Sequence, residues 1–188
     1  MNAIEAQTVA KSYQVGEVTV PALRGVSFVM EPGSFVSFVG ASGSGKTTLL
    51  NLIGCLDRPT SGTLTVLGTD VSSFDAKQGA LFRGQNIGFI FQDFNLLPEL
   101  SVYENVEYPL IMVQSWPERW RPERVLELLS AVGMADQAQK RPDQISGGQK
   151  QRVAVARALA PDTKIVLADE STANLDSETA HKVIDLMR

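Results

Sequence analysis

The sequence predicts an α/β protein with a phosphate-loop core on a mostly parallel sheet, an N-terminal antiparallel β subdomain and an inserted helical subdomain. Three observations favour this class. A glycine-rich loop at residues 40–48 stands between a strand-like run and a helix-like run. Residues 1–30 alternate apolar and polar positions, as half-buried strands do. From Pro98 the pattern becomes helical, and an apolar run at 164–168 then returns to strand.

The glycine-rich loop fits the pattern G-x-x-x-x-G-K-[ST]. Its residues are Gly40, Ala41, Ser42, Gly43, Ser44, Gly45, Lys46, Thr47 and Thr48. Glycines let successive N–H groups turn inward around an anion. Lys46 adds a positive charge for the outer phosphates, and Thr47 offers a hydroxyl to Mg²⁺. We expect a strand at 35–39 before the loop and a helix at 48–53 after it, so that the helix N-terminus also faces the anion. The alternative is a flexible Gly-Ser linker.

The composition is typical of one soluble globular domain. The chain has 188 residues, of which 44% are hydrophobic and 20% charged. Its apolar runs are too short to cross a bilayer, and its first ten residues lack the features of a secretory signal. Cys55 is the only cysteine, which favours a reducing compartment; we expect it buried or half-buried on the helix after the loop. The net charge of −4 argues against a nucleic-acid partner.

The pattern along the chain predicts the elements in turn. Short strands are expected within 1–30 and at 62–67, with turns at 61–62 and 67–70. Ser101 and Glu104 form a capping box before a helix that Pro109 disturbs. Further helices are expected from Pro122 to a stop at Gly133, at 150–160 and at 177–188. The first of these has the apolar face Val125, Leu126, Leu128, Leu129 and Val132. The run at 164–168 suits a strand buried on both faces.

These elements imply a single domain over residues 1–188 with three parts. Residues 1–30 and about 60–72 make the β subdomain. Residues 31–58, 80–95 and 153–188 make the phosphate-loop core. Residues 96–152 make the helical subdomain.

Two carboxylates follow the last predicted strand. Asp169 and Glu170 stand at its carboxyl end, the edge where open α/β sheets bind ligands. Asp169 can hold Mg²⁺ through its water shell, and Glu170 can polarise the water that attacks the terminal phosphorus. Without the glycine-rich loop, a solvated pair at a strand end would be the simpler reading.

A second glycine-rich helix start precedes Lys150. Ser146, Gly147, Gly148 and Gln149 combine a hydroxyl with exposed backbone, which indicates another anion site, or else an ordinary N-cap. Two phosphate-binding motifs in one chain allow two arrangements. Either both motifs fold onto one nucleotide, or each motif faces a different copy of the chain.

The order and spacing of these motifs resemble an ABC-transporter ATPase subunit over essentially the whole chain. The stretches that carry the resemblance are 40–48, Gln92, 145–149, 165–170 and 174–176. Four longer stretches resemble the subfamily that drives lipoprotein release and macrolide export, namely 20–26, 49–54, 56–62 and 94–98. The family implies a P-loop NTPase core, ATP hydrolysis with Mg²⁺, a homodimer, a separate transmembrane permease, and a position on the cytoplasmic face of the inner or plasma membrane.

The resemblance also implies residue roles. Tyr13 matches the aromatic that stacks on adenine, although an aromatic on a strand more often serves packing. Gln92 matches the glutamine that links Mg²⁺ or the attacking water to the helical insert. The 146–149 signature would touch ATP held by the opposing subunit. Asp176 matches the loop that bridges the two sites, and also suits a helix N-cap.

The chain departs from the family pattern in three places. Ser171 stands where proline is usual, and Lys150 puts a positive charge at a helix start. The family's switch histidine lies in a segment beyond Arg188, and His181, the only histidine, comes too early and is expected to be solvated. The resemblance therefore implies a chain truncated before that histidine and weak ATP hydrolysis.

Two tryptophans stand at i, i+4 spacing. Trp116 and Trp120 serve core packing, or form the lip of a groove that accepts a helix of a membrane partner. An apolar patch formed with Leu96, Leu97 and Leu100 would support the second interpretation. The nearby arginines at 119, 121 and 124 are expected to be solvated.

The sequence thus indicates an ATP-binding and ATP-hydrolysing subunit that powers a permease. The alternative is a soluble ABC-type ATPase that acts on ribosomes or DNA. A GTPase would need an N-K-x-D string that does not occur, and a small-molecule kinase would not explain residues 146–149.

Overall fold

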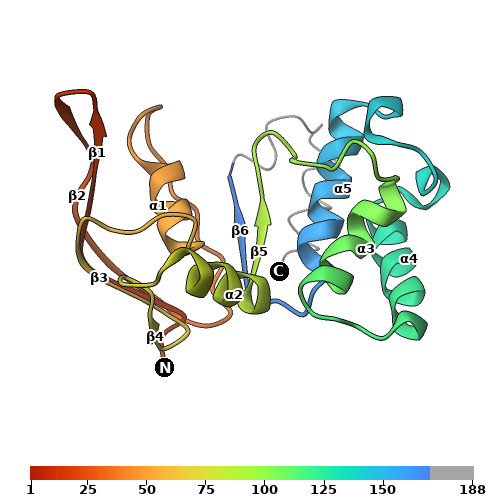
Figure 1. Ribbon diagram of the computed structural model, residues 1–188, viewed down its shortest axis with the longest axis horizontal. Coiled ribbons are helices and arrows are strands. Elements are labelled where there is room, and N and C mark those ends of the chain that lie inside the picture. The colour runs from red at the N-terminus through yellow and green to blue at the C-terminus, as the bar shows by residue number, and fades with distance from the viewer. Residues whose placement is uncertain (170–188) are drawn as a thin grey trace. The chain divides into compact units, whose positions relative to one another are not determined.

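The computed structural model describes residues 1–169 of the chain in two compact units, one over Met1–Arg83 and the other from Gly84 onward (Figure 1). The first unit holds a four-stranded antiparallel sheet, and the second holds a pair of parallel strands with a group of helices. The predicted α/β class is confirmed. The predicted division into β, core and helical parts stays a prediction.

The sheet of the first unit is built on two long strands. Strand β1 (Ile4–Val15) pairs antiparallel with β2 (Val18–Met30) through a tight turn in which Gly16 has a φ of 60°. The other edge of β1 pairs with β3 (Ser61–Val66), which pairs with β4 (Thr69–Asp70). The alternating pattern at 1–30 therefore belongs to two long strands rather than several short ones. Ala10 of β1 pairs with Ser61 at the start of β3. Lys11 and Tyr13 therefore lie at the opposite end of the sheet from the turn at Leu67, which follows β3.

The predicted turn at Ser61-Gly62 is wrong, because both residues open β3. Gly62 has a φ of 85°, and a Cβ on it would lie 2.4 Å from the carbonyl oxygen of Thr8. Thr8 itself has a φ of 48° where the β1–β3 register shifts between Gln7 and Ala10. Glycine is needed here for a close backbone approach at a bulge.

Two helices complete the first unit. Helix α1 (Lys46–Ile53) follows the glycine-rich loop as predicted, and buries Leu49, Leu50, Leu52 and Ile53. Cys55 is half-buried as expected, but it lies beyond the end of α1. Helix α2 (Ala76–Asn86), which was not predicted, begins in this unit and ends in the next. Its sequence has little helical amphipathicity, so periodicity gave no signal.

The predicted strand at 35–39 is also absent. Residues 33–40 have no regular structure, and Phe35, Val36 and Val39 are exposed. An apolar run becomes a strand only where a neighbouring strand satisfies its backbone groups. Among residues 1–169, neither sheet includes this run.

The parallel pair of the second unit is formed by β5 (Ile87–Ile90) and β6 (Ile165–Ala168). Strand β5 is buried throughout, whereas in β6 only Leu167 is buried and the other residues are half-buried. The strand at 164–168 is therefore confirmed, but its burial on both faces is not. Because the strands are parallel, their carboxyl ends lie at the same edge.

Three α-helices pack side by side in the second unit (Figure 1). They are α3 (Val102–Met112), α4 (Arg121–Ala131) and α5 (Gly147–Leu159). Short 3₁₀ turns at Glu118–Trp120, Ala135–Gln137 and Pro142–Gln144 connect them. Pro109 lies inside α3, which ends three residues later. Gly133, with a φ of 64°, follows α4 as predicted.

The helices enclose one apolar core. Val106 and Leu110 of α3, Leu129 of α4 and Val153 of α5 are fully buried. Leu126 was predicted on the buried face of α4 but is 47% exposed, because that face is narrower than the run of apolar residues. Asn105 is buried too, and its amide donates to the carbonyls of Leu97, Leu100 and Ser101.

Two of the arginines predicted as a solvated run are only partly exposed and have protein partners. Arg124 donates to the carbonyls of Leu159 and Ala160, which have no partner within α5 because that helix ends there. Arg121 lies 3.4 Å from Glu107 of α3 with a side chain that is 15% exposed. Over residues 1–169, no helix is long and apolar enough to cross a membrane.

Candidate nucleotide site

The glycine-rich loop closes on the N-terminus of α1. Gly45 is the N-cap residue with a φ of 91°, a left-handed conformation that favours glycine. A Cβ at this position would lie 2.6 Å from the carbonyl oxygen of Ala22 in β2. Both the backbone conformation and the neighbouring strand therefore require glycine at this point. No side chain caps α1, so its first N–H groups remain available to an anion.

Lys46 reaches back over the same loop. Its ammonium group donates to the carbonyl oxygens of Gly40, at 2.9 Å, and Ala41, at 3.0 Å. The loop residues from Gly40 to Ser44 and Thr47 are exposed, while Lys46 is half-buried. The Lys46 ammonium, the N-terminus of α1 and the Thr47 hydroxyl thus lie within the first turn of the helix. Together these donors fit a phosphate group.

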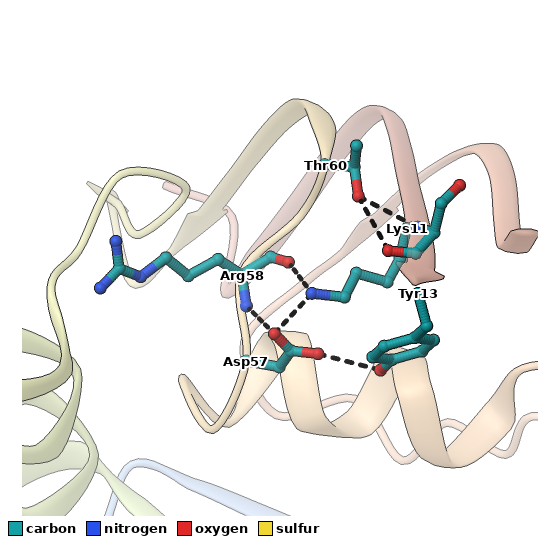
Figure 2. A network of polar contacts seen from close by, with 6 residues as sticks. Lys11, Tyr13, Asp57, Arg58 and Thr60 are labelled. Carbon is teal, nitrogen blue, oxygen red and sulfur yellow. Dashed lines mark hydrogen bonds and ion pairs between the residues drawn. The ribbon is translucent and has the colours of Figure 1, made fainter. Parts of the chain in front are cut away.

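Tyr13 lies in β1 and takes part in a polar network with the segment after α1 (Figure 2). Its hydroxyl donates to Asp57 Oδ2 at 2.9 Å. The other carboxylate oxygen, Asp57 Oδ1, lies 2.5 Å from Lys11 Nζ and accepts the Arg58 N–H at 2.7 Å. Tyr13 is 37% exposed.

The network sets the protonation of its members. Burial raises the pKa of Tyr13, and the bond to the Asp57 carboxylate raises it further, so the phenol keeps its proton and donates. Burial also acts to raise the pKa of Asp57. The bonds from Lys11, from the Arg58 backbone and from Tyr13 outweigh burial, and the pKa of Asp57 is lowered. Asp57 is therefore an ionised acceptor at neutral pH.

Asp169 and Gln92 follow the two parallel strands of the second unit. Asp169 comes directly after β6, and its N–H donates to the carbonyl of Ile90 at 3.0 Å, which extends the ladder by one residue. Its side chain is 8% exposed. Gln92 stands two residues after β5 and is exposed. Both residues therefore lie at the carboxyl edge of the strand pair, which was predicted for Asp169.

The 146–149 segment forms the start of α5. Ser146 is the N-cap, and its hydroxyl accepts the N–H of Gln149 at 3.3 Å. The Gln149 side chain in turn accepts the N–H of Ser146 at 2.8 Å. Ser146 and Gly147 are exposed. The N-cap interpretation is therefore confirmed, while the anion-site interpretation stays a prediction.

Sequence reasoning missed Arg157, which joins this helix to the segment after Gln92. Its guanidinium donates to the carbonyl of Phe94 at 2.7 Å and to the carbonyl of Asn95. Both acceptors have positive φ values, 62° and 48°. Burial lowers the pKa of Arg157. No local sequence pattern indicates that Arg157 pairs with two backbone carbonyls some sixty residues earlier in the chain.

The predicted residues thus fall into two groups. The glycine-rich loop and Tyr13 belong to the first unit, whereas Gln92, Asp169 and the 146–149 segment belong to the second. The predicted Glu170 and Asp176, the substituted position Ser171, the histidine His181 and the helix at 177–188 lie outside the described residues.

The two tryptophans have different environments. Trp116 is half-buried against the helical core, with its indole N–H donating to Gln114 at 2.9 Å. Trp120 is 52% exposed, and the Arg119 guanidinium lies 5.3 Å from its ring centroid. Both line an open hollow of about 550 Å³ whose other walls are Gln114, Ser115, Pro117, Glu123, Arg124 and Glu127.

Comparison with known proteins shows the family. The profile of the ABC transporter family matches residues 23–173. An uncharacterized ABC transporter ATP-binding protein of Thermotoga maritima is 50% identical over 98% of this chain and 79% of its own length. The Bacillus subtilis protein YknY is 46% identical over 97% of this chain and 79% of its own length. A macrolide export ATP-binding/permease protein MacB of Syntrophobacter fumaroxidans is 48% identical, and the chain spans only 26% of it.

Solved structures agree with this. The ATP-binding cassette MJ0796, in a dimeric post-hydrolysis state bound to ADP and Pi, matches with a TM-score of 0.92 and 42% identity over 97% of this chain and 80% of that one. A second dimeric structure of the same cassette gives 0.92 and 43%. The glycine-rich loop on α1, the carboxyl edge of β5 and β6 and the capped start of α5 are thus parts of an ATPase, and the chain belongs to the ABC transporter family.

Proposed function

We propose that this chain binds ATP on the 40–48 loop and hydrolyses it to drive a transmembrane permease. The observation that carries the proposal is the Lys46 ammonium, held by two carbonyls of the loop beside the uncapped N-terminus of α1. Positive charge and free N–H groups at one point suit the β- and γ-phosphates of a nucleotide. Tyr13, exposed in the same unit, is assigned to stacking on the adenine base.

Mg²⁺ is the metal that this donor set fits. The hydroxyl of Thr47, the amide of Gln92 and the carboxylate of Asp169 are all oxygen donors, which hard cations prefer. When bound, Mg²⁺ neutralises charge on the phosphate oxygens. Asp169 is buried, so little water surrounds its carboxylate. Its attraction for a bound cation would therefore be stronger than that of a fully hydrated carboxylate. Glu170, the next residue, is assigned to orienting the attacking water as general base.

We further propose that two copies of the chain act together. Ser146 and Gly147 are exposed at the start of α5, and the nucleotide loop belongs to the other unit of the chain. The related cassette MJ0796 is dimeric, which supports placing this segment, with Gly148 and Gln149, on ATP held by a partner. Asp176 is assigned to the loop between the two sites. Binding of ATP then closes the pair, and hydrolysis reopens it.

The proposal of a permease partner rests on the family and on one surface of the chain. The hollow beside Trp116 and Trp120 presents a half-exposed indole, a side chain that interfaces favour. We propose that a helix of the permease contacts it, which places the chain at the cytoplasmic face of the membrane. The MacB similarity supports a role in macrolide export or in the related release of lipoproteins.

One experiment tests the assignment. A tagged chain with Glu170→Gln, isolated from native membranes with ATP, should retain a membrane permease. A matched variant with Trp120→Ser should lose it, whereas Leu126→Ser, an equally exposed apolar site on α4, should not. Recovery of ribosomes or DNA in place of a permease would contradict the proposal and favour the soluble ABC-type ATPase.

A further inference from the structure

The aromatic ring of Tyr13 is fixed at its hydroxyl end. The hydroxyl donates to Asp57 Oδ2 at 2.9 Å, so a residue of the segment that follows α1 holds a residue of β1 (Figure 2). Helix α1 itself begins at Lys46, within the G-K-[ST] pattern. The Tyr13 ring is therefore tied by a side chain to the segment that continues from the phosphate loop.

Asp57 is itself held in one orientation. Its Oδ1 atom lies 2.5 Å from Lys11 Nζ and accepts the Arg58 N–H at 2.7 Å, while Oδ2 is left to Tyr13. Lys11 also donates to the Arg58 carbonyl at 2.7 Å. The side chains of Lys11 and Asp57 are only 12% and 29% exposed, which shields this charge pair from solvent.

The same lysine restricts the ring directly. Lys11 Nζ lies 4.9 Å from the ring centroid of Tyr13, within range of a cation–π contact. Lys11 and Tyr13 are two residues apart on β1 and so share one face of the strand. The tyrosine still exposes 37% of its surface, so the network orients the ring without covering it.

We propose that Asp57, supported by Lys11, is a positioning residue that fixes Tyr13 as the platform for the adenine base. This inference rests on the proposed function, in which Tyr13 stacks on that base. A ring whose rotamer is set before binding loses less freedom when the base arrives, and this gain appears as affinity. Asp57 touches neither phosphate nor base in this role and acts only through Tyr13.

The test compares ADP with pyrophosphate, which share two phosphates and differ by adenosine. Affinities are measured by calorimetry, with pyrophosphate in competition against ADP. The wild-type chain should prefer ADP by about fivefold or more, since one base stack contributes at least that much. Asp57→Asn and Tyr13→Phe should each weaken ADP binding by about threefold to tenfold. Both should leave pyrophosphate affinity unchanged within about twofold.

A double variant and a control separate positioning from folding. Tyr13→Phe removes the donor of the bond between Tyr13 and Asp57. In Asp57→Asn the single amide oxygen is held by Lys11 and the Arg58 N–H, so the amide nitrogen faces Tyr13 and the phenol loses its acceptor. Because both substitutions remove the same hydrogen bond, the double variant should weaken ADP binding no more than either alone. Asp70→Asn removes a carboxylate that accepts the Ser72 N–H in the same unit, and should change neither affinity. A loss of pyrophosphate binding in Asp57→Asn would show general damage to the site and overturn the proposal.

The remaining outcomes are distinct. An unchanged preference for ADP in Asp57→Asn would overturn the positioning role and leave Tyr13 as a base platform. Equal affinity of the wild-type chain for ADP and pyrophosphate would overturn both assignments. Absence of ADP binding to the wild-type chain would contradict the proposed function itself.

Discussion

Lys46 is the residue on which the proposed phosphate site depends most directly. Its ammonium is held by the carbonyls of Gly40 and Ala41, so the charge is already in place over the loop. Such preorganisation reduces the ordering cost that a flexible lysine would pay on binding. Gly45 has the complementary role, because its φ of 91° and the nearby Ala22 carbonyl leave no room for a side chain.

Lys46→Ala should therefore weaken ATP binding by about tenfold to hundredfold, the range expected for the loss of a hydrogen bond to a charged group. Calorimetry with ADP avoids turnover during the measurement. Lys77→Ala provides a matched control, since Lys77 is an exposed lysine of α2 in the same unit. An affinity for ADP that stays the same in both variants would remove Lys46 from the site.

Cys55 offers a prediction about reactivity. Burial raises the pKa of its thiol to about 11, and the positive charge of Arg83 offsets only part of this. The reactive thiolate is therefore scarce at pH 8 and becomes abundant only as the pH approaches the raised pKa. Alkylation at pH 8 should be slow in the native chain and roughly a hundredfold faster in denaturant, where the pKa returns to its ordinary value. Equal rates in the two states, followed by mass spectrometry, would contradict this.

At the scale of elements, local patterns were predicted well. The capping box at Ser101, the N-cap interpretation of Ser146 and the helix after the glycine-rich loop depend on residues within a few positions of one another. The sequence therefore contains all of the partners. The same holds for Gly133, whose left-handed conformation ends α4.

Features that need distant partners were not predicted. Gly62 resembles a turn residue, but it lies in a strand because Thr8 of β1 approaches it closely. The run at 35–39 has strand composition, yet it belongs to neither sheet. The bond between Lys11 and Asp57 joins positions 46 residues apart. The only local hint was the i, i+2 spacing of Lys11 and Tyr13, which puts both side chains on one face of the strand.

The two capping boxes allow stability to be separated from function. Ser146→Ala and Ser101→Ala each remove a hydroxyl that accepts the N–H three residues later, and each should lower the free energy of unfolding by about 1 kcal/mol. Only Ser146→Ala should also reduce ATP hydrolysis, because Ser146 is assigned to the partner's ATP. Chemical denaturation and a phosphate-release assay measure the two effects. A parallel loss of activity in Ser101→Ala would reduce the role of Ser146 to capping.

At the scale of the whole molecule, the residues proposed to act on ATP belong to two units of the chain. The phosphate loop and Tyr13 belong to one unit, and Gln92, Asp169 and the 146–149 segment belong to the other. Arg157 holds the segment after Gln92 to the helix that begins at Ser146. This link joins α5 to the residues next to Gln92, which suits an enzyme that couples nucleotide binding to motion elsewhere.

The pairing of two chains leads to the last prediction. Glu170, assigned as general base, should be dispensable for binding and required for hydrolysis, so Glu170→Gln should bind ATP and accumulate as a closed pair. Size-exclusion chromatography with light scattering should give twice the mass of one chain with ATP, and the mass of one chain with ADP, because ADP lacks the phosphate that the partner's Ser146 contacts. Adding Lys46→Ala should shift the ATP-dependent pairing to ATP concentrations about tenfold to hundredfold higher, because it weakens nucleotide binding by that factor. Persistence of single chains at saturating ATP would mean that each copy encloses its nucleotide alone.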